Sequence, residues 1–421
     1  MELRFLPCLV AGLLLASSIG CTIRTPGPGP ETATTVPGPV PDLPSWSDPP
    51  PTTIAELEGR SHPMGFAVMD IEGAAMTMHR LEDSRRVEIW RPDSIRSEDL
   101  PLDLDPTAID SVEARIAVVE LADTDPRSNL SIPPRRAIDG LLFTPSRRSD
   151  GRMVLILGSL ARFNPGERWL VEAFLRDGWS VLLSSPPITS PDPEHGAMTV
   201  ISPGLDPELA GRVLAAEIEV ALGAWAVGIT AITSELQNAG SLPEGPTVLV
   251  GMSSGGLASP VATAVLDPIR RVDSVVLMAT GADPPVIVAG TTLDDDDLRI
   301  ERRGPQADAA DMERFVSSYA GAATLASSIL WTWFADRPLL IIEAGFDAAI
   351  PSTARAELRS RLPGADHWWL PTGHFGLFAA MIREADSIVR WVREKCPEGS
   401  GTASEDPTEG SPTGPSPGIP R

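Results

Sequence analysis

The chain has 421 residues, of which 42% are hydrophobic, so it can bury the core of one large domain and still carry extensions. Its formal net charge of -23 at pH 7 excludes the basic surface that binds nucleic-acid phosphates, so we expect no nucleic-acid partner. The 3 cysteines, Cys8, Cys21 and Cys396, imply no disulfide framework.

The N-terminus has the pattern of a signal peptide. Arg4 precedes an apolar run at residues 9–19, which is shorter than the roughly 20 residues of a membrane-spanning helix. The run leads into SIGC at 18–21, which resembles the lipobox of bacterial lipoproteins, although Ser18 stands where that pattern usually has leucine. We expect a signal peptide over 1–20, lipidation of Cys21 and attachment to a bacterial membrane outside the cytoplasm. Ordinary secretion is the alternative, and an unlipidated Cys21 could pair with Cys396.

Two segments are too poor in apolar residues to fold. Residues 21–53 are rich in Pro, Gly and Thr and predict an extended tether, and residues 397–421 predict a disordered tail. The folded part is therefore expected at about 54–396.

The folded part has two patterns. Short alternating segments between residues 66 and 132 predict β-strands, which make 54–137 a β-rich N-terminal extension. Further along, continuous apolar runs alternate with helical patterns and predict a mostly parallel sheet covered on both faces, in which ligands bind beyond the carboxyl ends of the strands. The expected strands are 153–157, 179–183, 247–250, 274–278, 338–343 and 367–370. Residues 284–334 are too long for one connection and are expected to form a cap insertion.

The run at 247–250 ends in GMSSG at residues 251–255, and a helical pattern follows it. Gly-x-Ser-x-Gly between a strand and a helix resembles the nucleophile elbow of the α/β-hydrolases, whose strained turn leaves no room for larger neighbours. The resemblance makes Ser253 the nucleophile candidate. A dinucleotide loop or simple close packing is the alternative interpretation of the same small residues.

A serine hydroxyl needs a base, and the family has a histidine after its last strand. Of the 5 histidines, His374 stands at this point, before a helical pattern at 377–392. His367 begins the last strand and is expected to be structural. His62 and His79 precede the sheet, and His195 lies in a Pro-rich segment.

The histidine needs a carboxylate. Asp347 follows the run at 338–343, and the chain order Ser253, Asp347, His374 is that of the family. Asp283, one strand earlier, is the rival, and Glu343 is the weaker candidate because it ends the strand itself.

The resemblance also implies two amide donors for an oxyanion. One is the residue after the nucleophile, Ser254, and the other lies in the turn after 153–157. Leu160 is favoured for the second donor, and Ser159 stays open because the His-Gly pair common in relatives is absent.

The resemblance covers about 138–395, the α/β-hydrolase domain being expected at 138–396. It implies a sheet of about eight mostly parallel strands and a serine hydrolase without cofactor or metal, acting on a small-molecule or lipid ester. A peptidase of the same fold, or an inactive surface-tethered binding protein, is the alternative.

Two features of the expected cap remain. The aspartates at 294–297 are expected to form a solvated turn, and the aromatic residues Trp331, Trp333 and Phe334 either line an acyl pocket or pack in the core of the cap.

Overall fold

The computed structural model describes residues 61–62, 66–72, 75–80, 85–90, 112–122, 135–145, 151–160, 164–187, 206–242, 244–292, 309–323, 328–334 and 336–396. The chain divides into two compact units, Met1–Leu43 and Pro44–Arg421, and every described residue belongs to the second. The expected signal peptide, Cys21, the tether, the acidic turn at 294–297 and the C-terminal tail lie outside these residues.

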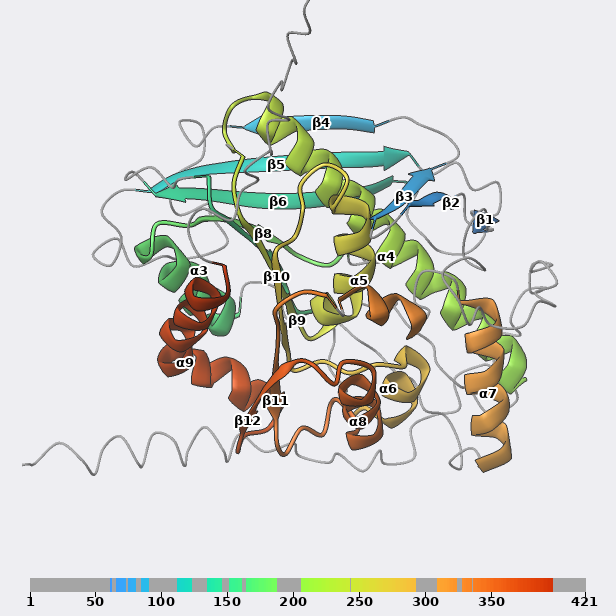
Figure 1. Ribbon diagram of the computed structural model, residues 1–421. Coiled ribbons are helices and arrows are strands. Elements are labelled where there is room, and N and C mark those ends of the chain that lie inside the picture. The colour runs from blue at the N-terminus through green and yellow to red at the C-terminus, as the bar shows by residue number, and fades with distance from the viewer. Residues whose placement is uncertain are drawn as a thin grey trace, which may run out of the picture. The chain divides into compact units, whose positions relative to one another are not determined.

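The central element is a sheet of nine strands in the order β12-β11-β10-β9-β7-β8-β6-β5-β4, counted over the described ranges (Figure 1). The strands from β12 to β8 are parallel to one another, whereas β6, β5 and β4 continue the sheet in antiparallel pairing. The bounds are β4 Arg85–Trp90, β5 Val112–Ala122, β6 Arg135–Pro145, β7 Met153–Leu157, β8 Ser180–Ser184, β9 Thr247–Met252, β10 Ser274–Met278, β11 Leu339–Ala344 and β12 Asp366–Leu370.

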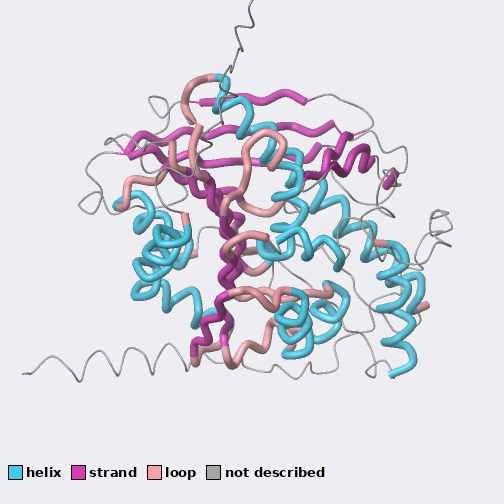
Figure 2. The backbone as a smooth tube through the Cα atoms, in the orientation of Figure 1, coloured by secondary structure: helices cyan, strands magenta, loops and turns pink. Residues whose placement is uncertain are grey.

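Helices cover both faces of this sheet, and Figure 2 shows the strands as a spine between two groups of helices. The helices α3 (Pro165–Arg176) and α9 (His374–Lys395) pack together on one face. They cover a buried cluster that includes Val154 and Ile156 of β7. The opposite face is covered by α4 (Pro207–Asn238), α5 (Ser254–Leu266), α6 (Pro284–Gly290), α7 (Ala309–Ala322) and α8 (Ser352–Arg361). Residues of β7, β8 and β9 are buried throughout because both faces are covered.

The predicted fold class, an α/β-hydrolase architecture with a mostly parallel sheet between helices, is confirmed, with nine strands in place of about eight. The region expected as an extension, 54–137, contributes β4 and β5 to the main sheet. The remaining strands, β1 (Ser61–His62), β2 (Phe66–Glu72) and β3 (Ala75–Arg80), form a separate antiparallel sheet. The strand β6 begins at Arg135 and so crosses the expected boundary between 137 and 138.

The expected cap segment, 284–334, contains α6, α7 and the 3-10 helix Ser328–Phe334, while its residues 293–308 and 324–327 lie outside the described part. The three aromatic side chains of the 3-10 helix are buried in the same core cluster as residues of α4 and α5. Trp331 and Phe334 meet edge to face, with ring centroids 6.0 Å apart. The two alternatives for these aromatic residues were the lining of an acyl pocket and packing in a core, and the residues pack in a core. Among the described helices, none has the length and apolar content needed to cross a membrane.

Candidate functional site

The turn between β9 and α5 presents Ser253 at the carboxyl end of the parallel strands. Ser253 has φ 53° and ψ -111°, a backbone region that side-chain-bearing residues rarely adopt, and its N–H donates to the Met278 carbonyl at 2.8 Å. The flanking glycines are sterically required: a Cβ on Gly251 would lie 2.1 Å from Ser259 Oγ, and one on Gly255 2.0 Å from the Leu157 carbonyl oxygen. The small residues of the motif therefore permit a strained turn packed against two neighbouring elements.

His374 is the first residue of α9, directly after the loop that follows β12. Its Nε2 lies 3.2 Å from Ser253 Oγ, although the two residues are 121 positions apart in the chain. Phe375 and Phe378 contact the imidazole ring edge to face, at centroid distances of 5.6 and 5.3 Å. The ring is thus held by packing on two sides while one nitrogen faces the serine.

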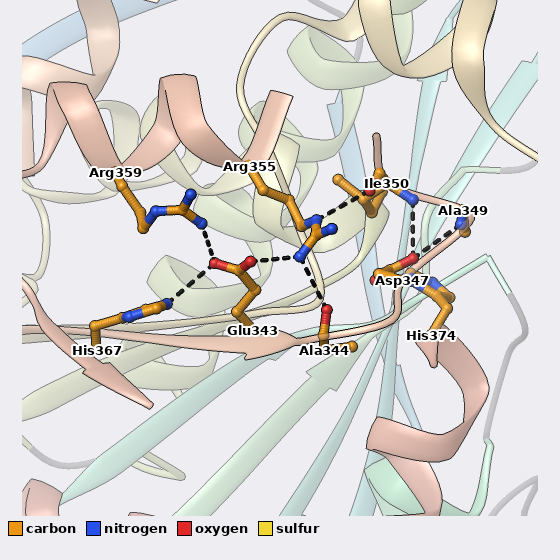
Figure 3. A network of polar contacts seen from close by, with 9 residues as sticks. All are labelled: Glu343, Ala344, Asp347, Ala349, Ile350, Arg355, Arg359, His367 and His374. Carbon is orange, nitrogen blue, oxygen red and sulfur yellow. Dashed lines mark hydrogen bonds and ion pairs between the residues drawn. The ribbon is translucent and has the colours of Figure 1, made fainter. Parts of the chain in front are cut away.

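Asp347 lies in the loop between β11 and α8, and its Oδ2 is 2.8 Å from His374 Nδ1 (Figure 3). Its other oxygen, Oδ1, accepts hydrogen bonds from the backbone N–H groups of Ala349 and Ile350, both at 2.9 Å. Ser253, Asp347 and His374 are each 7% exposed. The structure therefore brings the three sequence-predicted residues into one continuous, buried hydrogen-bonded chain.

The two rival carboxylates lie elsewhere. Glu343 pairs with Arg355, with Arg359 and, at 3.0 Å, with His367 Nε2, so it is part of a separate network (Figure 3). Burial acts to raise the pKa of the Glu343 carboxyl, but Arg359, Arg355 and His367 outweigh it and hold that pKa below its usual value.

Asp283 is the residue before the short helix α6, in a left-handed conformation with φ 60°, and its side chain makes no capping hydrogen bond to the helix. Burial raises the pKa of the Asp283 carboxyl, an effect that nearby Arg361 opposes. The carboxylate bonded to the His374 ring is that of Asp347, so the order of preference derived from the sequence agrees with the geometry.

The turn after β7 lies against the N-terminus of α5, as the contact of Gly255 with Leu157 shows. Two of its three amides are occupied: Gly158 N–H donates to the Ser184 carbonyl at 2.8 Å, and Ser159 N–H donates to Glu167 Oε1 at 2.8 Å. Within the described residues, the N–H of Leu160 is bonded to no acceptor. Ser254 begins α5, and the first amides of a helix have no acceptor within it. These are the two amides that the sequence singled out.

Sequence reasoning did not single out Glu167, which organises this turn. Its buried carboxylate accepts from the Ser159 N–H, from the Ser159 hydroxyl at 3.1 Å and from Asn164 N–H at 3.2 Å. Asn164 caps α3 in return, accepting from Glu167 N–H at 3.1 Å. The signal was present, because Asn followed three positions later by Glu before an apolar helix is the capping-box pattern.

The described part of the chain contains no cluster of three His, Cys, Asp or Glu side chains that could hold a metal ion. Two exposed aromatic side chains are adjacent in sequence to Asp347 and His374: Phe346 is 69% exposed and Phe375 is 58% exposed. Phe346 also packs on Trp369, at a centroid distance of 5.9 Å.

Comparison with known proteins yields structural likeness only. No family profile matches the chain, and no curated protein matches it in sequence. Solved structures similar to it include a cold-adapted esterase from an Arctic intertidal metagenomic library, at 16% identity over 68% of this chain and 95% of the other, with a TM-score of 0.39. The Pyrococcus furiosus esterase PF2001 is 15% identical over 69% of this chain and 94% of its own, with a TM-score of 0.41. The esterase domain of a Rhodothermus marinus protein is 14% identical over 66% and 98%, with a TM-score of 0.40. At these scores the likeness assigns no activity to this chain.

Proposed function

We propose that the chain is a serine hydrolase that cleaves an ester bond through an acyl-enzyme intermediate. The observation that supports this most strongly is the buried chain Ser253–His374–Asp347, with 3.2 Å between the hydroxyl oxygen and the base and 2.8 Å between the base and the carboxylate. A hydroxyl on a strained turn, beside an imidazole whose second nitrogen is bonded to a carboxylate, is an arrangement suited to nucleophilic attack.

In the proposed reaction, His374 Nε2 takes the proton of Ser253 as Oγ attacks the ester carbonyl. The N–H groups of Ser254 and Leu160 stabilise the oxyanion of the tetrahedral intermediate, and His374 returns the proton to the departing alcohol. Water then attacks the acyl-enzyme with His374 again as the base. The bond between the acyl carbon and Ser253 Oγ breaks, His374 returns the proton to Oγ, and the acid product departs. Asp347 keeps the imidazole in the tautomer that presents an unprotonated Nε2 to the serine.

The proposed substrate is an apolar small-molecule or lipid ester. Phe346 and Phe375 support this, because exposed aromatic side chains beside the acid and the base favour apolar groups over charged ones. We also propose that Cys21 carries a lipid anchor and holds the enzyme on the outer side of a bacterial membrane, which would bring it close to lipid esters.

The test is a comparison of p-nitrophenyl esters of increasing acyl length with p-nitroanilides of the same acyl groups, using the full-length chain. We expect ester hydrolysis that strengthens with acyl length and drops by about 10⁶-fold in Ser253→Ala. Cleavage of anilides in preference to esters would favour a peptidase of the same fold. Hydrolysis that persists in Ser253→Ala would contradict the proposal.

A further inference from the structure

Arg355, on the first turn of α8, bridges both ends of the loop that carries Asp347. Its Nη1 donates to the Ala344 carbonyl at 3.0 Å, where β11 ends, and its Nε donates to the Ile350 carbonyl at 3.1 Å, just before α8 (Figure 3). Residues 345–349 lie between these two contacts. One guanidinium therefore sets the distance between the two ends of the loop.

Ile350 connects this bridge directly to the carboxylate. Its N–H donates to Asp347 Oδ1 at 2.9 Å while its carbonyl accepts from Arg355. A displacement of Ile350 would move the group that orients Asp347, and Asp347 Oδ2 in turn contacts the His374 ring.

Glu343 orients the guanidinium. It pairs with Arg355 through one oxygen and with Arg359 and His367 through the other, and the side chains of Arg355 and Glu343 are only 10% and 8% exposed. A planar guanidinium has donors in several fixed directions and can serve a carboxylate and two carbonyls together, whereas an ammonium group is a point charge.

We propose that Arg355 is a positioning residue for the reaction: it holds the Asp347 loop so that the carboxylate stays aligned with His374. This inference rests on the proposed function. Displacements of about 1 Å in a catalytic arrangement can reduce the rate by about 10²-fold, so partial loosening of the loop is expected to lower kcat by about tenfold.

Arg359 provides a matched control. It binds the same carboxylate as Arg355 and lies one helical turn further along α8, but within the described residues it donates to neither carbonyl of the loop. Arg355→Lys and Arg359→Lys are the same chemical change, and both keep the positive charge beside Glu343. Only the first removes the bridge across the loop.

The experiment measures kcat and KM of the full-length wild type, Arg355→Lys and Arg359→Lys on a p-nitrophenyl ester, with kcat expressed per active site titrated by a fluorophosphonate. The titration counts only active enzyme. A purely structural role of Arg355 would change the share of inactive, unfolded protein but not kcat per titrated site. We expect kcat per site to fall about tenfold in Arg355→Lys with KM unchanged, and both constants to stay at the wild-type value in Arg359→Lys.

A wild-type kcat per site in Arg355→Lys, or an equal loss in both variants, would overturn the inference. If Arg355→Lys does not fold, the double variant Glu343→Gln/Arg355→Gln is the second test. It removes both charges of the pair, so neither residue is left as a buried charge without its partner. The same loss in kcat per site is expected, and an unchanged value would overturn the inference. Failure of the wild type to react with the fluorophosphonate at Ser253 would instead contradict the proposed function itself.

Discussion

At the scale of single residues, the two oxygens of Asp347 have different partners, and this difference predicts the effect of a one-atom change. Oδ1 accepts from two backbone N–H groups, so the oxygen of an asparagine at this position would be retained there. Its NH₂ group would then face His374 Nδ1 and force the proton onto Nε2, which could no longer accept the serine proton.

We therefore expect Asp347→Asn to lower kcat on an ester by about 10⁴-fold while the protein stays folded. Asp283→Asn is the control, since Asp283 is the rival aspartate that the sequence left open, and it should keep the wild-type kcat. Steady-state kinetics of the two variants checks this. The reverse result, with activity lost only in Asp283→Asn, would move the acid to the end of β10.

At the scale of elements, the packing of α5 against β7 predicts a large effect from one methyl group. A Cβ on Gly255 would lie 2.0 Å from the Leu157 carbonyl oxygen and 2.8 Å from that of Gly158, so α5 and the turn at 158–160 would have to separate. The Ser254 and Leu160 amides, which we propose as the two oxyanion donors, would then be moved apart.

We expect Gly255→Ala to lower kcat/KM by about 10²-fold, the scale of losing one oxyanion donor. Gly364→Ala is the matched control, because nothing lies within 4 Å of a Cβ at that glycine. Ester kinetics of both variants, with circular dichroism to check folding, makes the comparison. Equal activity in the two would contradict the placement of the donors.

The network around Glu343 predicts a pH dependence of stability. The pKa of Glu343 is lowered in the folded protein, so its contribution to the free energy of unfolding is present above the ordinary glutamate pKa of about 4.3 and is lost as the pH falls through the lowered folded value. Glu343→Gln should cost about 3 kcal/mol at pH 7, because Arg355 loses its buried partner, and progressively less below about pH 4.

Urea unfolding of wild type and Glu343→Gln across this pH range measures the difference. Glu357→Gln is the control. Glu357 pairs with Arg361 on the surface of α8, the helix that also carries Arg355, and the effect of this change should stay below about 1 kcal/mol. A destabilisation by Glu343→Gln that does not change with pH would show that the carboxylate charge is not its cause.

The elements that the sequence predicts well are those with a strong hydrophobic pattern. The runs at 153–157 and 274–278 are strands with those bounds, and the helical pattern at 377–392 lies within α9. The helix α8 carries no such pattern, because only Ala354, Arg355 and Leu358 of its residues are buried. The Arg355 bridge depends on α8, β11 and β12 meeting in space, and no local spacing encodes that meeting.

At the scale of the whole molecule, the sequence predicts the class of fold because alternating apolar strands and helices admit few other arrangements. It does not decide which of the strands before residue 138 extend the main sheet, since antiparallel edge strands have the same alternation as a separate extension. The triad is predicted from order along the chain, but order alone does not separate Asp347 from Asp283; the hydrogen bond between Asp347 Oδ2 and His374 Nδ1 does.

The N-terminal segment predicts where the molecule is found in a bacterium. We expect the wild type in the membrane fraction and Cys21→Ser released from it, because the thiol of Cys21 is the proposed site of lipid attachment. Cys396→Ser is the control and should stay with the membrane: Cys396 is buried, and its Sγ donates to Ser274 Oγ at 3.2 Å. Immunoblots of membrane and soluble fractions report the outcome, and an unchanged distribution of Cys21→Ser would exclude the anchor.

A serine activated by a histidine reacts with a fluorophosphonate probe, so labelling of the full-length protein tests the proposed activation of Ser253 by His374. We expect the wild type to be labelled at Ser253 and labelling to disappear in Ser253→Ala and His374→Ala, both folded. A folded wild type that takes up no probe would contradict a serine hydrolase and favour a surface protein that binds a ligand without chemistry.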